Sequence, residues 1–288
     1  MSVIANSAVL VRLNISVWGA SKRNKELEQE VARTKNADPK AMRMYDNLMV
    51  GSTGHSDVHK HAADCRLWHT QSTNPFDERG YRICPTSLFL DYKLHHNNKR
   101  DRFWSLVDTF RVKYLSYRET AKLYRGDIFN ELDYPPVEEA CSKFAWNFTV
   151  APVPESGHIC IDLPEQELAE VRASCDAEVD RRIEMAMQEN ETRLKKELRL
   201  ISGKCNDVGI DDLDEDSRRW HDSFVSNPLK LCEMLKHTNL TQDPKIEEAR
   251  HTLEELMRGK NKEMFKDSPH VRADAKSKVD SIIDKFDW

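Results

Sequence analysis

Glycine is scarce in this chain, with nine residues in 288. Neither the glycine-rich loop of P-loop proteins nor the Rossmann fingerprint is present, and HExxH and GxSxG motifs are also absent. Hydrophobic residues make up 39% of the chain and charged residues 32%. This balance is typical of long, partly solvated helices with a thin core. We therefore predict a protein that is not an enzyme and has no cofactor; a hydrolase with an unrecognised metal site is an alternative.

The chain also lacks paired cysteines and long apolar runs. Its seven cysteines are scattered without a CxxC pair, which is typical of reduced thiols in a cytoplasm. No apolar run approaches the roughly 20 residues that a membrane span needs, and the N-terminus has neither a basic start nor a cleavage site. The net charge of −5 argues against a uniformly basic nucleic-acid coat. These features predict a cytoplasmic protein with no membrane partner.

Two long helices of opposite charge are the strongest pattern that is present. Segment 89–125 carries nine Lys/Arg against four Asp/Glu, and segment 165–190 carries eight Asp/Glu against three Lys/Arg. In the basic segment large side chains alternate at four and three residues, the spacing of a helix seam. The seam residues are Phe103, Val107, Phe110, Tyr114, Tyr117, Ala121 and Tyr124. We predict that segments 89–125 and 165–201 pack antiparallel as a coiled-coil-like pair.

Three segments read as strands, because apolar and polar residues alternate along 9–17 and 144–151, and more briefly along 159–163. Three strands with one apolar face are more stable in water than a hairpin alone. The predicted fold is therefore mainly α (α+β). It places the long antiparallel helix pair on a small three-stranded antiparallel sheet and adds a C-terminal helical subdomain.

Several helix starts combine a capping side chain with a proline, as at Asp38-Pro39, Asn227-Pro228, Asp243-Pro244 and Ser268-Pro269. These pairs predict helices at 39–50, 228–237, 244–258 and 269–286. Pro164, followed by two glutamates, opens the acidic helix in the same way. The polar run around 205–212 reads as a linker. It divides the chain into a domain at 1–204 and a small helical domain at 213–288.

The candidate metal ligands are His61, Cys65 and His69, which share a helix face at i, i+4 and i+8. His59 belongs to the same cluster, and His55 lies just upstream. Three such ligands span about 12 Å along a helix, which is too far for one ion. We therefore predict no metal site, and packing of Cys65 and Trp68 in a mixed helix is the favoured interpretation.

A basic cluster is the only candidate binding surface. If the two long helices pair antiparallel, residues 93–102 come close to residues 193–204, where a phosphate backbone or an acidic partner could bind. The cluster consists of Lys93, Lys99, Arg100, Arg102, Arg193, Lys195, Lys196 and Arg199. The alternative is a solvated helix end, with basic residues placed there by the helix dipole. The neighbouring His95-His96 pair is not predicted to be catalytic, because neither a nucleophile nor an orienting partner for it can be identified in the sequence.

Three stretches of the chain carry a resemblance: VRLNISVWGASK at 11–22, FAWNFTVAPVPESG followed by IDLPEQELAEV, and FVSNPLKLCEMLKHTNLTQDPKIEEAR near the C-terminus. In this order they resemble a family of tailed-phage and prophage proteins of unknown function. The family pattern has an aromatic-His element, here Trp68-His69, but no cysteine at 65, which further weakens the zinc hypothesis. The resemblance implies a phage protein made in the host cytoplasm, near genes for DNA metabolism or an AAA ATPase.

Together these features predict a non-enzymatic bacteriophage accessory protein that acts by protein–protein interaction or self-assembly. The expected partner is a phage or host protein, with an AAA ATPase as one candidate, or a second copy of the chain in a homo-oligomer. The alternative function is binding of single-stranded or duplex DNA through the basic cluster.

Overall fold

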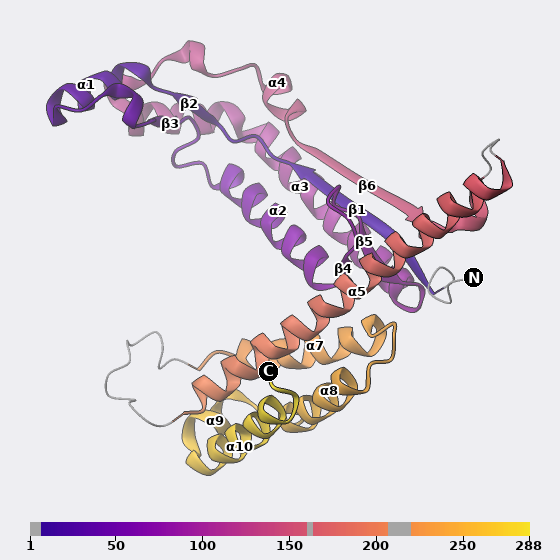
Figure 1. Ribbon diagram of the computed structural model, residues 1–288. Coiled ribbons are helices and arrows are strands. Elements are labelled where there is room, and N and C mark those ends of the chain that lie inside the picture. Colours follow the sequence, from indigo (N-terminus) through magenta and orange to yellow (C-terminus); the bar gives the residue numbers. More distant parts are fainter. Residues whose placement is uncertain (1–6, 160–163, 207–219) are drawn as a thin grey trace. The chain divides into compact units, whose positions relative to one another are not determined.

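The computed structural model describes residues 7–159, 164–206 and 220–288 (Figure 1). Its contacts divide the chain into two compact units. We call residues 13–69 and 93–148 the aromatic unit, and residues 1–12, 70–92 and 149–288 the bundle unit. The boundary falls inside two strands and two helices, so both units are built from segments far apart in sequence. The predicted linker at 205–212 lies mostly outside the described residues.

Helices dominate both units, as the composition predicts. The two longest are α3 (Thr86–Arg125) and α5 (Glu165–Lys204), each of 40 residues. The other helices are α1 (Lys25–Lys35), α2 (Thr53–Gln71), α4 (Val137–Ser142), α7 (Ser223–Thr238), α8 (Pro244–Met257), α9 (Lys262–Asp267) and α10 (Pro269–Phe286). Both long helices and the mainly α (α+β) fold class are thus confirmed.

The larger sheet has four described strands in the order β4-β5-β1-β6. These are β4 (Asn74–Pro75), β5 (Arg82–Pro85), β1 (Ala8–Ser16) and β6 (Ala145–Pro152). β5 pairs antiparallel with β1, with Val9 opposite Cys84, and β4 pairs antiparallel with β5.

The predicted neighbours β1 and β6 are confirmed, but the prediction of three strands is wrong. β4 and β5 are too short to show an alternating pattern, so no periodicity indicates them. The predicted strand at 159–163 lies outside the described residues except for Ile159.

The core of the aromatic unit forms where α2 lies beside α3 (Figure 1). The predicted seam is buried from Phe103 to Ala121, whereas Tyr124 is 69% exposed and does not belong to it. Gly54 at the start of α2 permits the close approach of the two helices, since a Cβ there would lie 2.6 Å from Tyr117 Oη. The Gly54 N–H instead donates a hydrogen bond to this oxygen.

The partner predicted for the seam is wrong. The side chains that fill it come from the aromatic unit: from β1, α2, α4 and the residues around Phe144. The buried face of α5 packs within the bundle unit instead. Heptad spacing marks a buried stripe but does not identify what covers it. Opposite net charge contributes little to pairing, because solvent and salt screen exposed charges.

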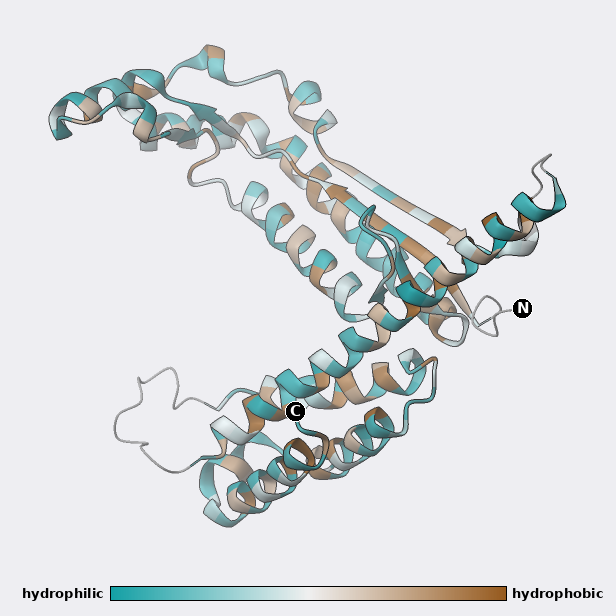
Figure 2. Cartoon of the chain, viewed as in Figure 1, coloured by the Kyte–Doolittle hydropathy of each residue, from teal (hydrophilic) through white to brown (hydrophobic). Residues whose placement is uncertain are grey.

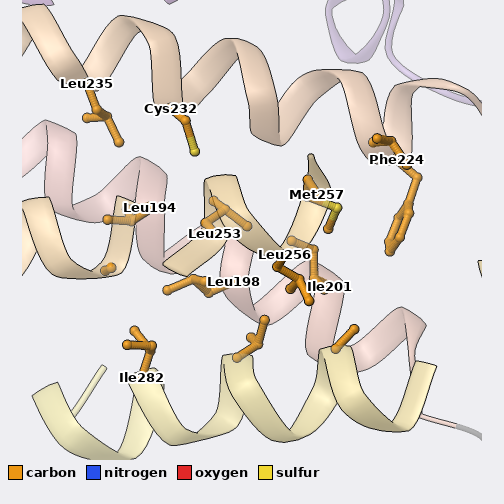
Figure 3. Packing of buried hydrophobic residues seen from close by; sticks show 14 of the residues in the cluster. Leu194, Leu198, Ile201, Phe224, Cys232, Leu235, Leu253, Leu256, Met257 and Ile282 are labelled. Carbon is orange, nitrogen blue, oxygen red and sulfur yellow. The ribbon is translucent and has the colours of Figure 1, made fainter. Parts of the chain in front are cut away.

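The bundle unit buries its largest apolar cluster between the C-terminal half of α5 and helices α7, α8 and α10. Leu198 and Ile201 of α5 face Leu253 and Leu256 of α8 in this cluster (Figure 3). The four helices alternate hydrophilic and hydrophobic residues along their length (Figure 2), the pattern of helices with one buried face. The middle of α5 packs in a second cluster with β1, β5 and Phe76.

The predicted proline caps have mixed outcomes. α8 and α10 begin at Pro244 and Pro269, and the Asp243 side chain accepts a hydrogen bond from the Lys245 N–H. α7 begins five residues before Pro228, because the buried side chains of Phe224 and Val225 extend the helix upstream.

The helix predicted at 39–50 is wrong, because Pro39 opens only a single 3₁₀ turn. The chain then forms β3 (Tyr45–Asn47), which pairs with β2 (Ser21–Arg23) in a two-stranded sheet. The Asp46 carboxylate of β3 forms an ion pair with the Arg125 guanidinium at 2.8 Å. It also accepts a hydrogen bond from the side-chain amide of Asn24 at 3.1 Å. These contacts lie far apart in sequence, so no local pattern could have indicated them.

Among the described residues, every helix is too short or too polar to span a bilayer.

Candidate functional site

A second apolar stripe runs along α3 on the face opposite its buried seam. We define the α3 stripe as Trp104, Val112, Leu115 and Leu123. Val112 and Leu123 are each 85% exposed and Leu115 is 63% exposed. At 3.6 residues per turn these four side chains project to one side of the helix, about half a turn from Phe103, Phe110 and Tyr117. A helix with two apolar faces can pack on its own unit with one face and present the other.

Charged residues accompany the stripe in a regular arrangement. Asp108 and Glu119 lie on the same face, between the apolar side chains, because they are spaced by whole turns from Val112 and Leu115. Arg111 and Arg118 lie along one flank. Arg111 pairs with Asp108 at 3.4 Å, and the partly buried Arg118 lies 3.9 Å from Glu119 and 3.3 Å from Glu131. The face therefore carries acidic side chains between its apolar ones, with basic residues along one flank.

The predicted basic cluster draws its residues from both units, with Lys93, Lys99, Arg100 and Arg102 in the aromatic unit. In the aromatic unit Lys93 Nζ lies 4.4 Å from the centre of the Phe148 ring, and Lys99 Nζ lies 5.3 Å from that of Trp68. Arg100 pairs with Asp101 at 2.9 Å, and Arg102 is exposed. Two of the four cations thus lie over aromatic rings.

The other half of the cluster belongs to α5 in the bundle unit. Arg193 is held at 2.9 Å from Glu189, and its guanidinium also donates to the carbonyls of Thr70 and Thr73. Lys195 pairs with Glu191 at 2.8 Å and lies over the Trp288 ring. Lys196 and Arg199 are exposed. The antiparallel helix pair was the reason to expect the two halves to meet, and that pairing is wrong.

The predicted metal candidates are placed on α2 as the helical spacing requires. His61 Nε2 lies 2.9 Å from the Lys99 carbonyl and 3.4 Å from Cys65 Sγ. Burial raises the pKa of the Cys65 thiol to about 11, which disfavours the thiolate that a metal would need. His69 is buried. The described residues contain no group of three or more His, Cys, Asp or Glu side chains arranged to hold one ion.

His96 of the sequence-predicted histidine pair is a core residue, 1% exposed. Trp146 Nε1 donates a hydrogen bond to His96 Nε2 at 2.9 Å, and Phe148 lies against the imidazole at 4.0 Å between ring centres. Since an indole N–H can only donate, Nε2 must carry a lone pair and the ring is neutral. Burial, as the largest cause, lowers the pKa of His96 from its usual value. This ring is a structural acceptor.

Sequence reasoning missed two features of the aromatic unit. The α3 stripe is detectable in the sequence, since Trp104, Val112, Leu115 and Leu123 repeat at helical spacing, but the aromatic seam is the stronger pattern on the same helix. The second feature is the His55 and His59 pair. Its i, i+4 spacing was visible in the sequence, whereas the backbone carbonyl that both rings approach is distant in sequence.

The chain matches no known family model, and no curated protein or solved structure is similar enough to it to support a comparison. The resemblance to tailed-phage proteins therefore stays a prediction.

Proposed function

We propose that the protein acts by protein–protein interaction, and that it self-associates through the α3 stripe. The observation that carries this proposal is the row of four large apolar side chains that α3 leaves exposed on the face opposite its buried seam. Burying such side chains in an interface gains roughly 25 cal/mol per Å² of apolar area. Large apolar side chains that a helix leaves exposed on one face typically mark a place where another molecule binds.

Charge favours a second copy of the chain as the occupant. Acidic Asp108 and Glu119 lie within the stripe, and basic Arg111 and Arg118 lie along one flank. In an antiparallel pair of α3 helices, the basic flank of one copy can approach the acidic positions of the other, and the two-fold symmetry repeats this contact. An interface of this kind is self-complementary in shape and in charge.

Sedimentation velocity over a range of protein concentrations tests this proposal. Changing Val112 and Leu115 together to Ser should shift the protein from dimer to monomer, while helicity stays unchanged because both side chains are exposed. A matched control is Lys113→Ser, which removes a long exposed side chain on the same turn but off the stripe; it should leave the dimer intact. A wild-type protein that stays monomeric at all concentrations would contradict the proposal.

The wider setting also belongs to the proposal: a phage accessory protein in the host cytoplasm, with a phage or host protein, an AAA ATPase among the candidates, as a further partner. Six cysteines among the described residues form no disulfide, which supports a reducing compartment. A pull-down from infected cells, with and without nuclease, would identify a protein partner that is retained without nucleic acid.

A further inference from the structure

Three polar atoms converge at the start of α2. His55 Nε2 and His59 Nε2 each lie 2.8 Å from the carbonyl oxygen of Trp18, and the two nitrogens lie 3.2 Å from each other. The histidines are one helical turn apart, so their rings lie side by side, with centres separated by 4.4 Å. Trp18 lies two residues after the end of β1, and its side chain is buried, which fixes the carbonyl in place.

No protonation state makes all three of these contacts attractive. A neutral imidazole has one N–H and one lone pair. If both Nε2 atoms carry the proton, both N–H groups can donate to the one oxygen, but they then oppose each other across 3.2 Å. If either Nε2 lacks the proton, its lone pair faces the lone pairs of the carbonyl oxygen at 2.8 Å. A cation beside the three atoms would be attracted to all of them.

We propose that His55, His59 and the Trp18 carbonyl form a binding site for a divalent transition-metal ion. Two nitrogens 3.2 Å apart, each at a typical bond length of about 2.0–2.1 Å, subtend an angle of about 100° at the ion, close to tetrahedral. Both rings are only partly buried, so solvent can complete the coordination and the ion can enter without unfolding.

The donor set determines which ions fit. Imidazole nitrogen suits Zn²⁺, Ni²⁺ and Cu²⁺, whereas Mg²⁺ and Ca²⁺ prefer sites built from oxygen. Only two side chains contribute, and no described carboxylate or thiol joins them to make a group of three. We therefore expect an exchangeable ion with open coordination positions, distinct from a closed structural zinc site. The site is independent of His61, Cys65 and His69, and of the proposed self-association.

Calorimetric titration of the full chain, without an affinity tag, tests the site with NiCl₂, ZnCl₂ and MgCl₂ as separate probes. We expect one equivalent of Ni²⁺ or Zn²⁺ and no binding of Mg²⁺. His55→Gln and His59→Gln should each weaken Ni²⁺ binding at least about tenfold, since loss of even an outer-shell partner costs that much. His270→Gln, a change at an exposed histidine of α10, should leave binding unchanged.

A spectroscopic measurement covers the case in which a variant fails to fold. The electron paramagnetic resonance spectrum of one equivalent of Cu²⁺ on the wild-type protein should show splitting from two nitrogen ligands. Absence of Ni²⁺ and Zn²⁺ binding, or binding that both histidine variants retain, would overturn the proposal and leave the two rings hydrogen-bonded to the carbonyl.

Discussion

Phe110 lies at the centre of the aromatic unit, fully buried in the seam of α3. Its ring contacts those of Trp18, Tyr114, Tyr117 and Phe144 at centre-to-centre distances between 5.7 and 6.2 Å. Edge and stacked contacts of this kind add to the gain from burying the apolar area. A single side chain therefore joins α3 to several segments that are distant in sequence.

Replacing Phe110 by Ala should lower the free energy of unfolding by about 3–5 kcal/mol, because the surrounding rings cannot close the cavity. Urea denaturation followed by circular dichroism measures this loss. Thr109→Ala is the control, because Thr109 precedes Phe110 in the chain and its own side chain is exposed. This substitution should change the free energy of unfolding by less than about 0.5 kcal/mol. Equal effects of the two substitutions would contradict the central role of Phe110.

His96 makes the stability of the aromatic unit depend on pH. The folded protein holds the ring neutral, with its pKa below the ordinary value of 6.5 because the ring is buried. Above about pH 6.5 the ring is neutral in both the folded and the unfolded chain. As the pH falls from 6.5 toward the lowered folded pKa, the unfolded chain takes up the proton first, so stability is lost. His55, whose pKa is also lowered by burial, acts in the same direction.

We expect urea midpoints to fall between about pH 7 and pH 5, and His96→Gln to reduce this pH dependence because the amide cannot titrate. His95→Gln is the matched control, since His95 is the exposed neighbour and should leave the pH dependence as in the wild type. If both variants keep the full pH dependence, other groups cause it.

At the scale of elements, α5 shows how one long helix is used for several contacts. Its C-terminal half packs with α7, α8 and α10, and its middle packs against residues of the sheet. Between these clusters Asn190, which is completely buried, donates to the Thr238 carbonyl at 2.9 Å. Arg193 lies three residues further on and reaches the carbonyls of Thr70 and Thr73.

Arg193→Ala should lower the free energy of unfolding by about 1.5–3 kcal/mol, because charge-assisted hydrogen bonds to two carbonyls are lost. Arg199→Ala removes an exposed arginine from the same helix and should cost less than about 0.5 kcal/mol. Thermal unfolding of the two variants beside the wild type measures the difference. If both variants melt at nearly the same temperature as the wild type, Arg193 is a surface residue in solution, as the basic-cluster hypothesis requires.

At the scale of the whole molecule, charge decides between protein binding and nucleic-acid binding. The chain carries a net charge of −5, and several residues of the predicted basic cluster are engaged by acidic or aromatic neighbours. Neutralising phosphates requires cations that are free to contact them. Long-range repulsion from a net acidic protein further opposes association with DNA.

We expect weak or no binding of a labelled oligonucleotide in fluorescence anisotropy at physiological salt. Submicromolar binding would reverse this expectation under two conditions. The logarithm of the binding constant should fall with the logarithm of the salt concentration at a slope near −0.7 per phosphate contact, and binding should be lost when Lys99, Arg100 and Arg102 are changed to Glu. A control with the same change in charge replaces Lys245, Lys266 and Lys278, which are exposed in the C-terminal helices.

The sequence by itself determined where several helices and two strands of the larger sheet lie. The helix seam from Phe103 to Ala121, the alternation along β1 and β6, and the caps at Pro244 and Pro269 are local patterns, set by neighbours within a few residues. They fixed the mainly α class with a small sheet, because periodicity and capping act within one segment of the chain.

The tertiary structure decided which elements meet. Periodicity marks the seam of α3 as buried, but only the folded chain shows α2 and Phe144 against it in place of α5. The same holds for Arg193 at the Thr70 carbonyl and for His55 and His59 at the Trp18 carbonyl. Arg193, His55 and His59 each contact a backbone carbonyl that is far away in sequence. Every residue has such a carbonyl, so its identity in the sequence does not mark it as a partner. The positions of these carbonyls follow from tertiary packing, which no short stretch of the sequence specifies.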